Sequence, residues 1–178
     1  FHRIFVGTGA PAIIAGVLKR SGITEFDLPA LVRRKRDLMN EIVQSRKLQT
    51  VDGFFEFFEE VKRRRLPKII ASGSNRDNIR TMLKNVGIND DFSEIISSEQ
   101  VPLPKPAPDI YFAAAKILNV EPSGCLVIED TDHGVYGAKA AGMRCIALLT
   151  TTDEAALKKA GADLIVKNYH EIPIGKYL

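Results

Sequence analysis

Three short segments of the chain combine residue types that can do chemistry: a hydroxyl beside a glycine, a lysine between prolines, and two adjacent acids. Each segment follows a short apolar run of the kind that forms a buried strand. In an open parallel sheet with helices on both faces, ligands bind beyond the carboxyl ends of the strands. The residues that follow predicted strands are therefore the first candidates for a site.

The first segment, Ser72-Gly73-Ser74-Asn75, follows the apolar run Lys68–Ser72 and precedes a helical pattern. A serine hydroxyl and backbone N–H groups at the start of a helix can bind an anion. The same four residues also make an ordinary turn that caps a helix. Both interpretations stay open for this segment on its own.

The second segment places Lys105 among three alternating prolines, Pro104, Pro106 and Pro108. Proline restricts its own backbone and that of the residue before it, so the chain is stiff on both sides of the lysine. A rigid frame suits an ammonium group whose position matters, for example against a phosphoryl group. The alternative is a helix start capped by proline, with a lysine that faces solvent, and we expect a helix from about Pro106 to Leu118.

The third segment, Glu129-Asp130, places two carboxylates where an apolar strand ends. Two like charges are costly to bury together, and a divalent cation removes that cost. Carboxylate oxygens beside a phosphate ligand suit Mg²⁺. The alternative is helix capping, for which Thr131 and Asp132 are well suited, and we expect His133 to be a capping or surface residue.

The predicted secondary structure that must position these segments changes near residue 50. Before it, the pattern predicts two helices, over Pro11–Arg20 and from the N-cap Asp27 to Lys47. After it, apolar strands alternate with helices, which predicts a Rossmann-like α/β unit with a parallel sheet covered on both faces. We expect a small helical unit over residues 1–50 and the α/β unit over 51–178. The predicted strands are Lys68–Ser72, Glu94–Ser97, Cys125–Glu129, Arg144–Leu149 and Asp163–Val166.

Composition and charge exclude several classes of protein. A chain of 178 residues with 45% hydrophobic content is typical of a globular protein, and its longest apolar run is too short to span a membrane. The basic clusters Arg33–Arg36 and Lys62–Arg65 lie in helical patterns with acidic neighbours, so we expect solvated helix faces and no nucleic-acid partner. Cys125 and Cys145 lie in apolar runs, which favours buried thiols, a reducing compartment and a cytoplasmic location. We expect a monomer or a weak homodimer.

In the order of these segments, the chain resembles the haloacid dehalogenase (HAD) superfamily, specifically the helical-cap branch that includes β-phosphoglucomutase and phosphoglycolate phosphatase. Ile69–Asn75 resembles the second family motif, Lys105–Tyr111 the third, and Val127–Thr131 the fourth. The resemblance implies that the region before residue 50 is a cap over the site. It also implies that a phosphoryl group is bound by Ser72, Gly73, Ser74 and Lys105, and Mg²⁺ by Asp130 and Glu129.

The first motif of the family, Asp-x-Asp-Gly, has no counterpart after a strand in this sequence, since Asp52-Gly53 follows none. In the family, this motif supplies a nucleophilic aspartate and a general acid/base. Because Phe1–Gly7 resembles a stretch inside the cap, we expect the missing strand to lie upstream of Phe1. Its absence would leave a gap between the strands Lys68–Ser72 and Cys125–Glu129, and residues 1–178 by themselves are expected to be inactive. The alternative is a degenerate relative that never had this motif.

The resemblance implies a Mg²⁺-dependent phosphatase that hydrolyses a small phosphomonoester, such as a sugar phosphate or phosphoglycolate, through an aspartyl-phosphate. A phosphomutase is the alternative, because Glu129-Asp130 resembles that subgroup, although Thr8-Gly9-Ala10 stands where it would have a cap arginine. A non-catalytic binding protein on the same scaffold is a hypothesis of another class. Lys35 falls on the cap helix where the family has a lysine that contacts substrate, and a solvated lysine is the other interpretation of this residue. The expected partner is a small phosphorylated metabolite.

Overall fold

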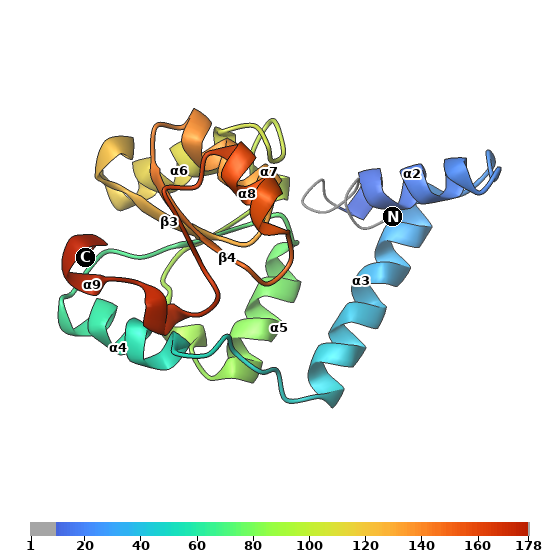
Figure 1. The fold of residues 1–178 in the computed structure, drawn as a ribbon. Coiled ribbons are helices and arrows are strands. Elements are labelled where there is room, and N and C mark those ends of the chain that lie inside the picture. The colour runs from blue at the N-terminus through green and yellow to red at the C-terminus, as the bar shows by residue number, and fades with distance from the viewer. Residues whose placement is uncertain (1–9, 178) are drawn as a thin grey trace.

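Two helices precede the α/β body in the computed structural model, which describes residues 10–177. Helices α2 (Ala10–Arg20) and α3 (Leu28–Ser45) form a hairpin that stands to one side of the body (Figure 1). The resemblance noted for Phe1–Gly7, and the comparison at Thr8 and Gly9, lie outside the described residues. We call this hairpin the cap.

Helix α3 begins as predicted, because the Asp27 carboxylate accepts a hydrogen bond from the backbone N–H of Ala30 at 2.8 Å. Its apolar residues recur with helical spacing, yet Leu31, Leu38 and Ile42 keep more than a third of their surface exposed. Val43 is the buried residue of this helix. The cap therefore contacts the body mainly near the end of α3.

The body alternates helices and strands in the predicted order, and four short 3₁₀ turns connect some of them. One boundary is wrong, since the helix expected from Pro106 begins at Asp109, after a turn in which the backbone N–H of Ala107 donates to the carbonyl oxygen of Pro104. The elements are α4 (Phe54–Arg63), β1 (Ile70–Ser72), α5 (Arg76–Val86), β2 (Ile95–Ser97), α6 (Asp109–Leu118), β3 (Leu126–Glu129), α7 (Asp132–Ala140), β4 (Arg144–Leu148), α8 (Glu154–Ala160), β5 (Leu164–Val166) and α9 (Ile174–Tyr177).

All the strand pairs are parallel, which confirms the predicted fold class. Strand β1 pairs with β2, and β3, β4 and β5 pair in that order. Within residues 10–177 these are two separate sheets, because no ladder joins β1 to β3. The gap expected between these two strands is therefore present, and each keeps one unpaired edge.

Helices cover both faces of the three-stranded sheet. On one face, Ile110, Val135 and Leu157 of α6, α7 and α8 pack with Cys145 and other buried residues. On the other face, Phe57 and Val61 of α4 pack against β4. Burial raises the pKa of the Cys145 thiol to about 12, and this thiol is free and fully buried as predicted. The prediction of burial is wrong for the Cys125 thiol, which is free and partly exposed.

The Asn85 side chain ties the end of the cap to the body. The Nδ2 group of Asn85, near the end of α5, donates hydrogen bonds to the carbonyl oxygens of Val43 at 2.6 Å and Arg46 at 2.9 Å. Its Oδ1 accepts a hydrogen bond from the backbone N–H of Leu48 at 2.8 Å. Asn85 therefore holds the segment that leaves the cap, while the domain boundary near residue 50 stays a prediction.

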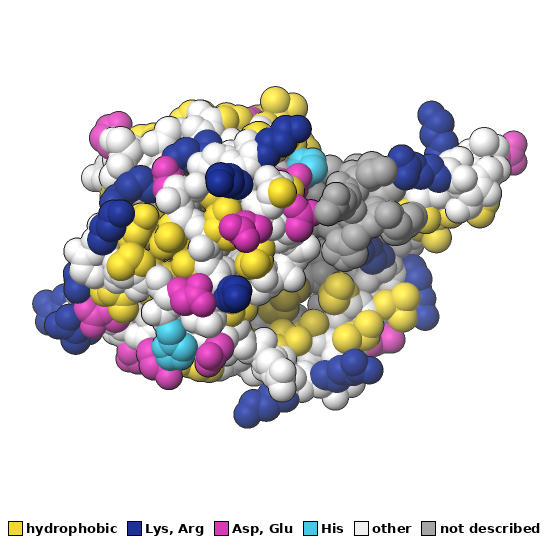
Figure 2. All heavy atoms as spheres, in the orientation of Figure 1, with side chains coloured by type: hydrophobic (Ala, Val, Ile, Leu, Met, Phe, Trp, Pro, Cys, Tyr) yellow, Lys and Arg dark blue, Asp and Glu magenta, His cyan; other side chains and the backbone are white. Residues whose placement is uncertain are grey.

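The two basic clusters lie on exposed helix surfaces (Figure 2). In α4 and just after it, Arg63 and Arg64 both form ion pairs with Glu60 at 2.6 Å, and Lys62 pairs with Glu59. These contacts agree with the expected solvated face, and the absence of a nucleic-acid partner stays a prediction. Among the described helices, none has the length and apolar character needed to cross a membrane.

Candidate functional site

The three predicted segments come together where β1 and β3 end. The Nζ atom of Lys105 donates a hydrogen bond to the carbonyl oxygen of Ala71 in β1 at 3.2 Å and contacts the Glu129 carboxylate in β3. One ammonium group therefore bridges the two separate sheets. It brings the turn after β1 and the acids after β3 to the same edge of the fold.

The turn after β1 is built as a helix start. The Oγ of Ser72 accepts a hydrogen bond from the backbone N–H of Ser74 at 3.1 Å, and the Asn75 side chain caps α5. The Oγ of Ser98 donates a hydrogen bond to the carbonyl oxygen of Gly73 at 2.9 Å, which fixes the turn from the β2 side. A Cβ atom added at Gly73 would meet no atom within 4 Å, so this turn faces open space. The capping interpretation is confirmed, and it leaves the turn open to an anion.

Lys105 is buried, with 8% of its surface exposed, so the alternative of a solvent-facing lysine is wrong. Its ammonium group lies 5.1 Å from the centre of the Tyr111 ring and pairs with Glu129, whose side chain is 9% exposed. The peptide bond from Lys105 to Pro106 is cis. A buried charge needs such a partner, because an unpaired ion in the interior is strongly destabilising.

The Glu129 carboxylate is surrounded by protein donors. Its Oε1 accepts from Lys105 and lies 2.8 Å from the hydroxyl of Tyr111, while its Oε2 lies 3.2 Å from the backbone N–H of Asp130 and 3.3 Å from the Thr131 hydroxyl. A Cβ atom at Gly134 would lie 2.1 Å from the Glu129 carboxyl carbon. Gly134 therefore makes room for this carboxylate.

No role was predicted for Tyr111 from the sequence, although its hydroxyl lies at the centre of this network. Its hydroxyl also lies 2.8 Å from the carbonyl oxygen of Gly134, and its side chain is 2% exposed. Burial, followed by the charge of Glu129, raises the pKa of Tyr111, so the hydroxyl stays protonated and can donate. An aromatic residue three positions after a proline gives no sequence signal for this role, because both acceptors come from elsewhere in the chain.

The Asp130 carboxylate accepts a hydrogen bond from the Thr151 hydroxyl. Thr131 caps α7 by accepting a hydrogen bond from the backbone N–H of Gly134 at 3.0 Å, and Asp132 pairs with His133, which confirms the predicted capping role of Thr131. In the part of the chain that the structure describes, no three acidic, histidine or cysteine side chains gather as a metal site would require. Asp130 has the oxygen chemistry that Mg²⁺ prefers, and Glu129 is held by Lys105, so the predicted metal site stays a prediction.

A pocket of about 600 Å³ lies between the cap and the turn after β1. Lys35 lines it, so this residue is placed beside the predicted phosphate-binding turn. Arg33 and Arg36, which belong to a cluster expected to be a solvated helix face, line it too, and their spacing of three residues places them on one face of α3. The buried Asn78 of α5 also lines this pocket. We call it the cap pocket.

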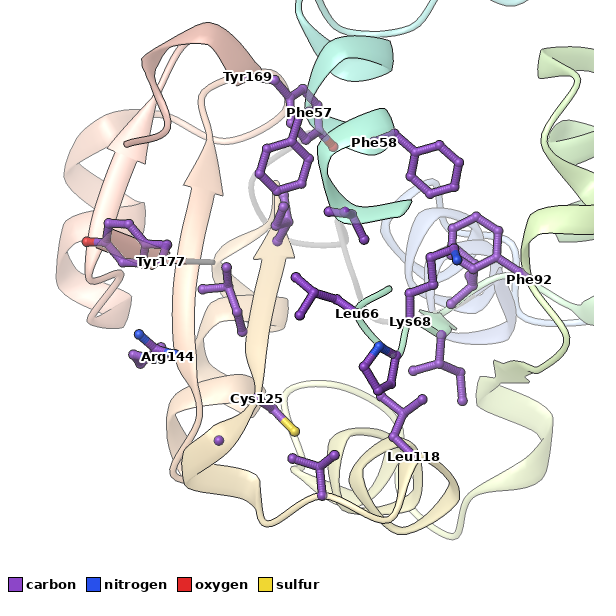
Figure 3. A pocket seen from close by; sticks show the side chains of 18 of the residues that line it. Phe57, Phe58, Leu66, Lys68, Phe92, Leu118, Cys125, Arg144, Tyr169 and Tyr177 are labelled. Carbon is purple, nitrogen blue, oxygen red and sulfur yellow. The ribbon is translucent and has the colours of Figure 1, made fainter. Parts of the chain in front are cut away.

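A second pocket, of about 500 Å³, occupies the gap between β1 and β3 on the side of α4. Figure 3 shows its mostly apolar walls, with Phe57 and Phe58 above, Leu118 and Cys125 below, and Leu66 between them. A smaller cavity of about 120 Å³ lies between the same strands on the side of α6. Both faces of the gap are therefore hollow, and we call the larger space the interstrand groove.

Comparisons with known proteins agree on one family of enzymes. The family model described as haloacid dehalogenase-like hydrolase matches residues 12–148. Protein SUPPRESSOR OF QUENCHING 1, chloroplastic, from Arabidopsis thaliana is 37% identical over 98% of the chain and 17% of its own length. Validoxylamine A 7'-phosphate phosphatase from Streptomyces hygroscopicus subsp. limoneus is 36% identical over 69% of the chain and 57% of its own length.

Among solved structures, a HAD hydrolase of family IA, variant 3, from Entamoeba histolytica superposes with a TM-score of 0.83 at 27% identity. The match covers 98% of the present chain and 79% of that protein. The chain thus spans less than two thirds of the two curated relatives and about four fifths of this structural neighbour.

Proposed function

The chain belongs to the haloacid dehalogenase-like hydrolases, and on that premise we propose that it carries the phosphate-binding half of a phosphohydrolase that acts on a small phosphomonoester. The observation that supports this most is the position of Lys105. A buried ammonium group stands where β1 and β3 end, next to an open turn that starts a helix. Both features favour a doubly charged oxyanion at that edge of the fold.

In this proposal, the residues of the chain bind the phosphoryl group and offset its charge. The Ser72 hydroxyl and the backbone N–H groups of Gly73 and Ser74 donate hydrogen bonds to its oxygens. Lys105 supplies positive charge at short range in a site with little water, where such an interaction is strong. Because Tyr111 and Glu129 hold Lys105, little reorganisation is needed when the charge develops.

A magnesium ion would be held by Asp130, with Glu129 behind it, and would offset the negative charge of the phosphoryl oxygens, which makes the phosphorus more electrophilic. The ligand chemistry supports this assignment, because Asp130 offers hard carboxylate oxygens at the edge of the sheet where Lys105 lies. Among the described residues, no third acid, histidine or cysteine gathers with these two carboxylates.

The nucleophile in this proposal is a carboxylate on a further strand seated in the interstrand groove. Two observations support a strand there. The groove is apolar and has unpaired strand edges on both sides, and a parallel strand would satisfy both. A carboxylate at the end of such a strand would emerge next to Lys105.

The test is hydrolysis of p-nitrophenyl phosphate by the protein at its natural length, with and without Mg²⁺. We expect magnesium-dependent turnover, its loss in Asp130→Asn, and normal turnover in the matched control Asp132→Asn, whose carboxylate contacts His133. Residues 1–178 by themselves are expected to leave the substrate intact. A normal rate in Asp130→Asn would refute the metal assignment, and binding of phosphate without any hydrolysis would favour a binding protein instead.

The cap pocket favours one second candidate, a phosphomutase. Three cations, Arg33, Lys35 and Arg36, line this pocket opposite the phosphate-binding turn, and such a charge suits a second phosphate group. Incubation with a sugar phosphate, followed by ³¹P NMR, separates the two activities. Appearance of a second phosphate ester would favour the mutase, and release of inorganic phosphate with no such ester would favour the phosphatase.

A further inference from the structure

The hydroxyl of Ser98 links the turn after β1 to the end of β2. Strands β1 and β2 pair in parallel up to Ser72 and Ser97, so Gly73 and Ser98 are the first residues beyond this ladder. There the Oγ of Ser98 donates a hydrogen bond to the carbonyl oxygen of Gly73 at 2.9 Å. A side chain therefore continues the pairing of the two strands at the point where the chain turns toward α5.

The local structure after β2 does not require this hydroxyl. The 3₁₀ turn Ser98–Gln100 is capped by Ser97, whose side chain forms a capping box with Gln100. Ser97 is fully buried, whereas Ser98 is partly exposed and lines the cap pocket. The two adjacent serines therefore have different partners, since Ser97 closes its own turn and Ser98 reaches the turn after β1.

The contact with Ser98 fixes one peptide group of the binding turn at both ends. In a trans peptide group, the carbonyl oxygen and the N–H point in opposite directions. The carbonyl oxygen of Gly73 accepts from Ser98. The N–H of Ser74, in the same peptide group, donates to the Oγ of Ser72 at 3.1 Å. Because the oxygen of Ser72 accepts this bond, its own hydrogen is left to donate to a ligand in the cap pocket, which Ser72 also lines.

Without Ser98, this peptide group would be held at one end only. Glycine has a wide choice of backbone conformations, and a Cβ atom at Gly73 would meet no atom within 4 Å, so no neighbour packs where a side chain would be. Rotation of the peptide group by half a turn would bring the Gly73 carbonyl oxygen toward Ser72. The Ser72 hydroxyl would then donate to this oxygen and would be lost to a phosphate.

We propose that Ser98 is a positioning residue, whose hydroxyl fixes the peptide group between Gly73 and Ser74 so that the turn binds phosphate. The inference rests on the proposed function, which places the phosphoryl group at this turn. It adds that the affinity for phosphate depends on a residue that acts through the turn. Donors that are fixed before the ligand arrives bind it more strongly, because less ordering is needed on binding.

The experiment measures binding of inorganic phosphate by ³¹P NMR titration, without Mg²⁺, to the protein at its natural length. The variants are Ser98→Ala, Ser98→Thr, which keeps a hydroxyl, and Ser98→Val, which has the shape of threonine without a hydroxyl. We expect an affinity about fivefold lower in Ser98→Ala and Ser98→Val, and an affinity within about twofold of the parent in Ser98→Thr. If Ser98→Ala does not fold, the pair of Ser98→Thr and Ser98→Val gives the comparison at equal volume.

Two further measurements separate positioning from a general loss of stability. Ser97→Ala is the control, because it removes the cap of the 3₁₀ turn. For this control we expect a lower midpoint of thermal unfolding by circular dichroism and a phosphate affinity within about twofold of the parent. In a Ser72→Ala background, we expect Ser98→Ala to lower the affinity by about twofold or less, because both residues act through the same turn.

Equal affinity of the parent and Ser98→Ala would overturn the inference while phosphate still binds. An equal loss in Ser98→Thr and Ser98→Val, an equal loss in Ser97→Ala, or an undiminished effect of Ser98→Ala in the Ser72→Ala background would overturn it as well. Absence of phosphate binding by the parent would overturn the proposed function together with the inference. The expected loss in Ser98→Ala, without any magnesium-dependent hydrolysis by the parent, would leave the inference standing and refute the enzyme.

Discussion

Two groups of cations in this molecule face the same end of the fold and differ in their burial and in their partners. Lys105 is buried and contacts a carboxylate, a carbonyl oxygen and an aromatic ring. The cap cations Arg33, Lys35 and Arg36 are exposed on α3. Ion pairs elsewhere on this helix are exposed as well, such as Arg34 with Glu41 at 3.9 Å. Among the cap cations, Arg36 lies 3.4 Å from the Asp37 carboxylate in an exposed pair. Loss of Lys105 should therefore destabilise the fold much more than loss of the cap cations.

Replacing Lys105 by Met gives the largest expected effect. The change leaves Glu129 charged and buried without a cation, which lowers the free energy of unfolding by about 3–5 kcal/mol. Urea unfolding followed by circular dichroism measures it, and Lys35→Met is the matched control, with a change of less than about 0.5 kcal/mol. A loss below about 1 kcal/mol in Lys105→Met would contradict the assignment of Lys105 as a structural partner of Glu129.

Replacing Tyr111 by Phe tests the support of the same pair. The variant keeps the ring beside Lys105 and removes the hydroxyl that faces Glu129 and Gly134, so we expect a loss of about 1–2 kcal/mol in unfolding free energy. Tyr136→Phe is the control, because the Tyr136 side chain is exposed. Equal stability of the two variants would show that the Tyr111 hydroxyl contributes nothing to the network.

In exposure, the pair of Lys139 and Asp163 lies between Lys105 and the cap cations, with about a third of each side chain exposed. Burial raises the pKa of Asp163, but hydrogen bonds from Lys139 and from the backbone N–H of Cys145 outweigh it and lower that pKa overall. A carboxyl group with a lowered pKa stabilises the fold above its unfolded pKa and loses this contribution as pH falls through the folded pKa.

We therefore expect Asp163→Asn to cost about 0.5–1 kcal/mol near neutral pH and progressively less below about pH 4. Unfolding free energies measured between neutral pH and about pH 3 give the profile. A cost that stays constant over this range would mean that the Asp163 charge is not the source of the stabilisation.

Removing the cap cations should give the smallest change in stability and a clear change in binding. For the double variant Arg33→Gln and Arg36→Gln, we expect an unfolding free energy within about 0.5 kcal/mol of the parent. Titration with inorganic phosphate should show weaker binding, and the difference from the parent should shrink as salt is added. An unchanged affinity for phosphate at low salt would show that the cap cations take no part in binding.

Much of the fold could be predicted from the sequence because its signals are local. The caps Asp27 and Thr131 bond to backbone groups three residues away, and apolar strands separated by helices indicate a parallel sheet. The start of α6 was misplaced because Pro106 and Pro108 suit a tight turn as well as the first turn of a helix. Local patterns do not separate these two uses of proline.

The candidate site was only partly predictable, because its side chains find partners far away in the chain. The prolines around Lys105 indicated a fixed position, but its partners Ala71 and Glu129 lie 34 and 24 residues away. Nothing local to Ser98 shows that its hydroxyl reaches Gly73, 25 residues away. The order of the three segments was informative because parallel strands bring their carboxyl ends to one edge.

Asn85 makes helix α5 a direct connection between the turn after β1 and the cap. The helix starts at the turn with Ser72 and Asn75. Near its other end, the Asn85 side chain forms hydrogen bonds with the end of α3 and with the segment that leaves the cap. Asn75 and Asn85 are ten positions apart, which corresponds to about 15 Å along the helix axis. One rigid helix therefore connects the turn after β1 to the segment that leaves the cap, so the position of the cap is tied to the position of that turn.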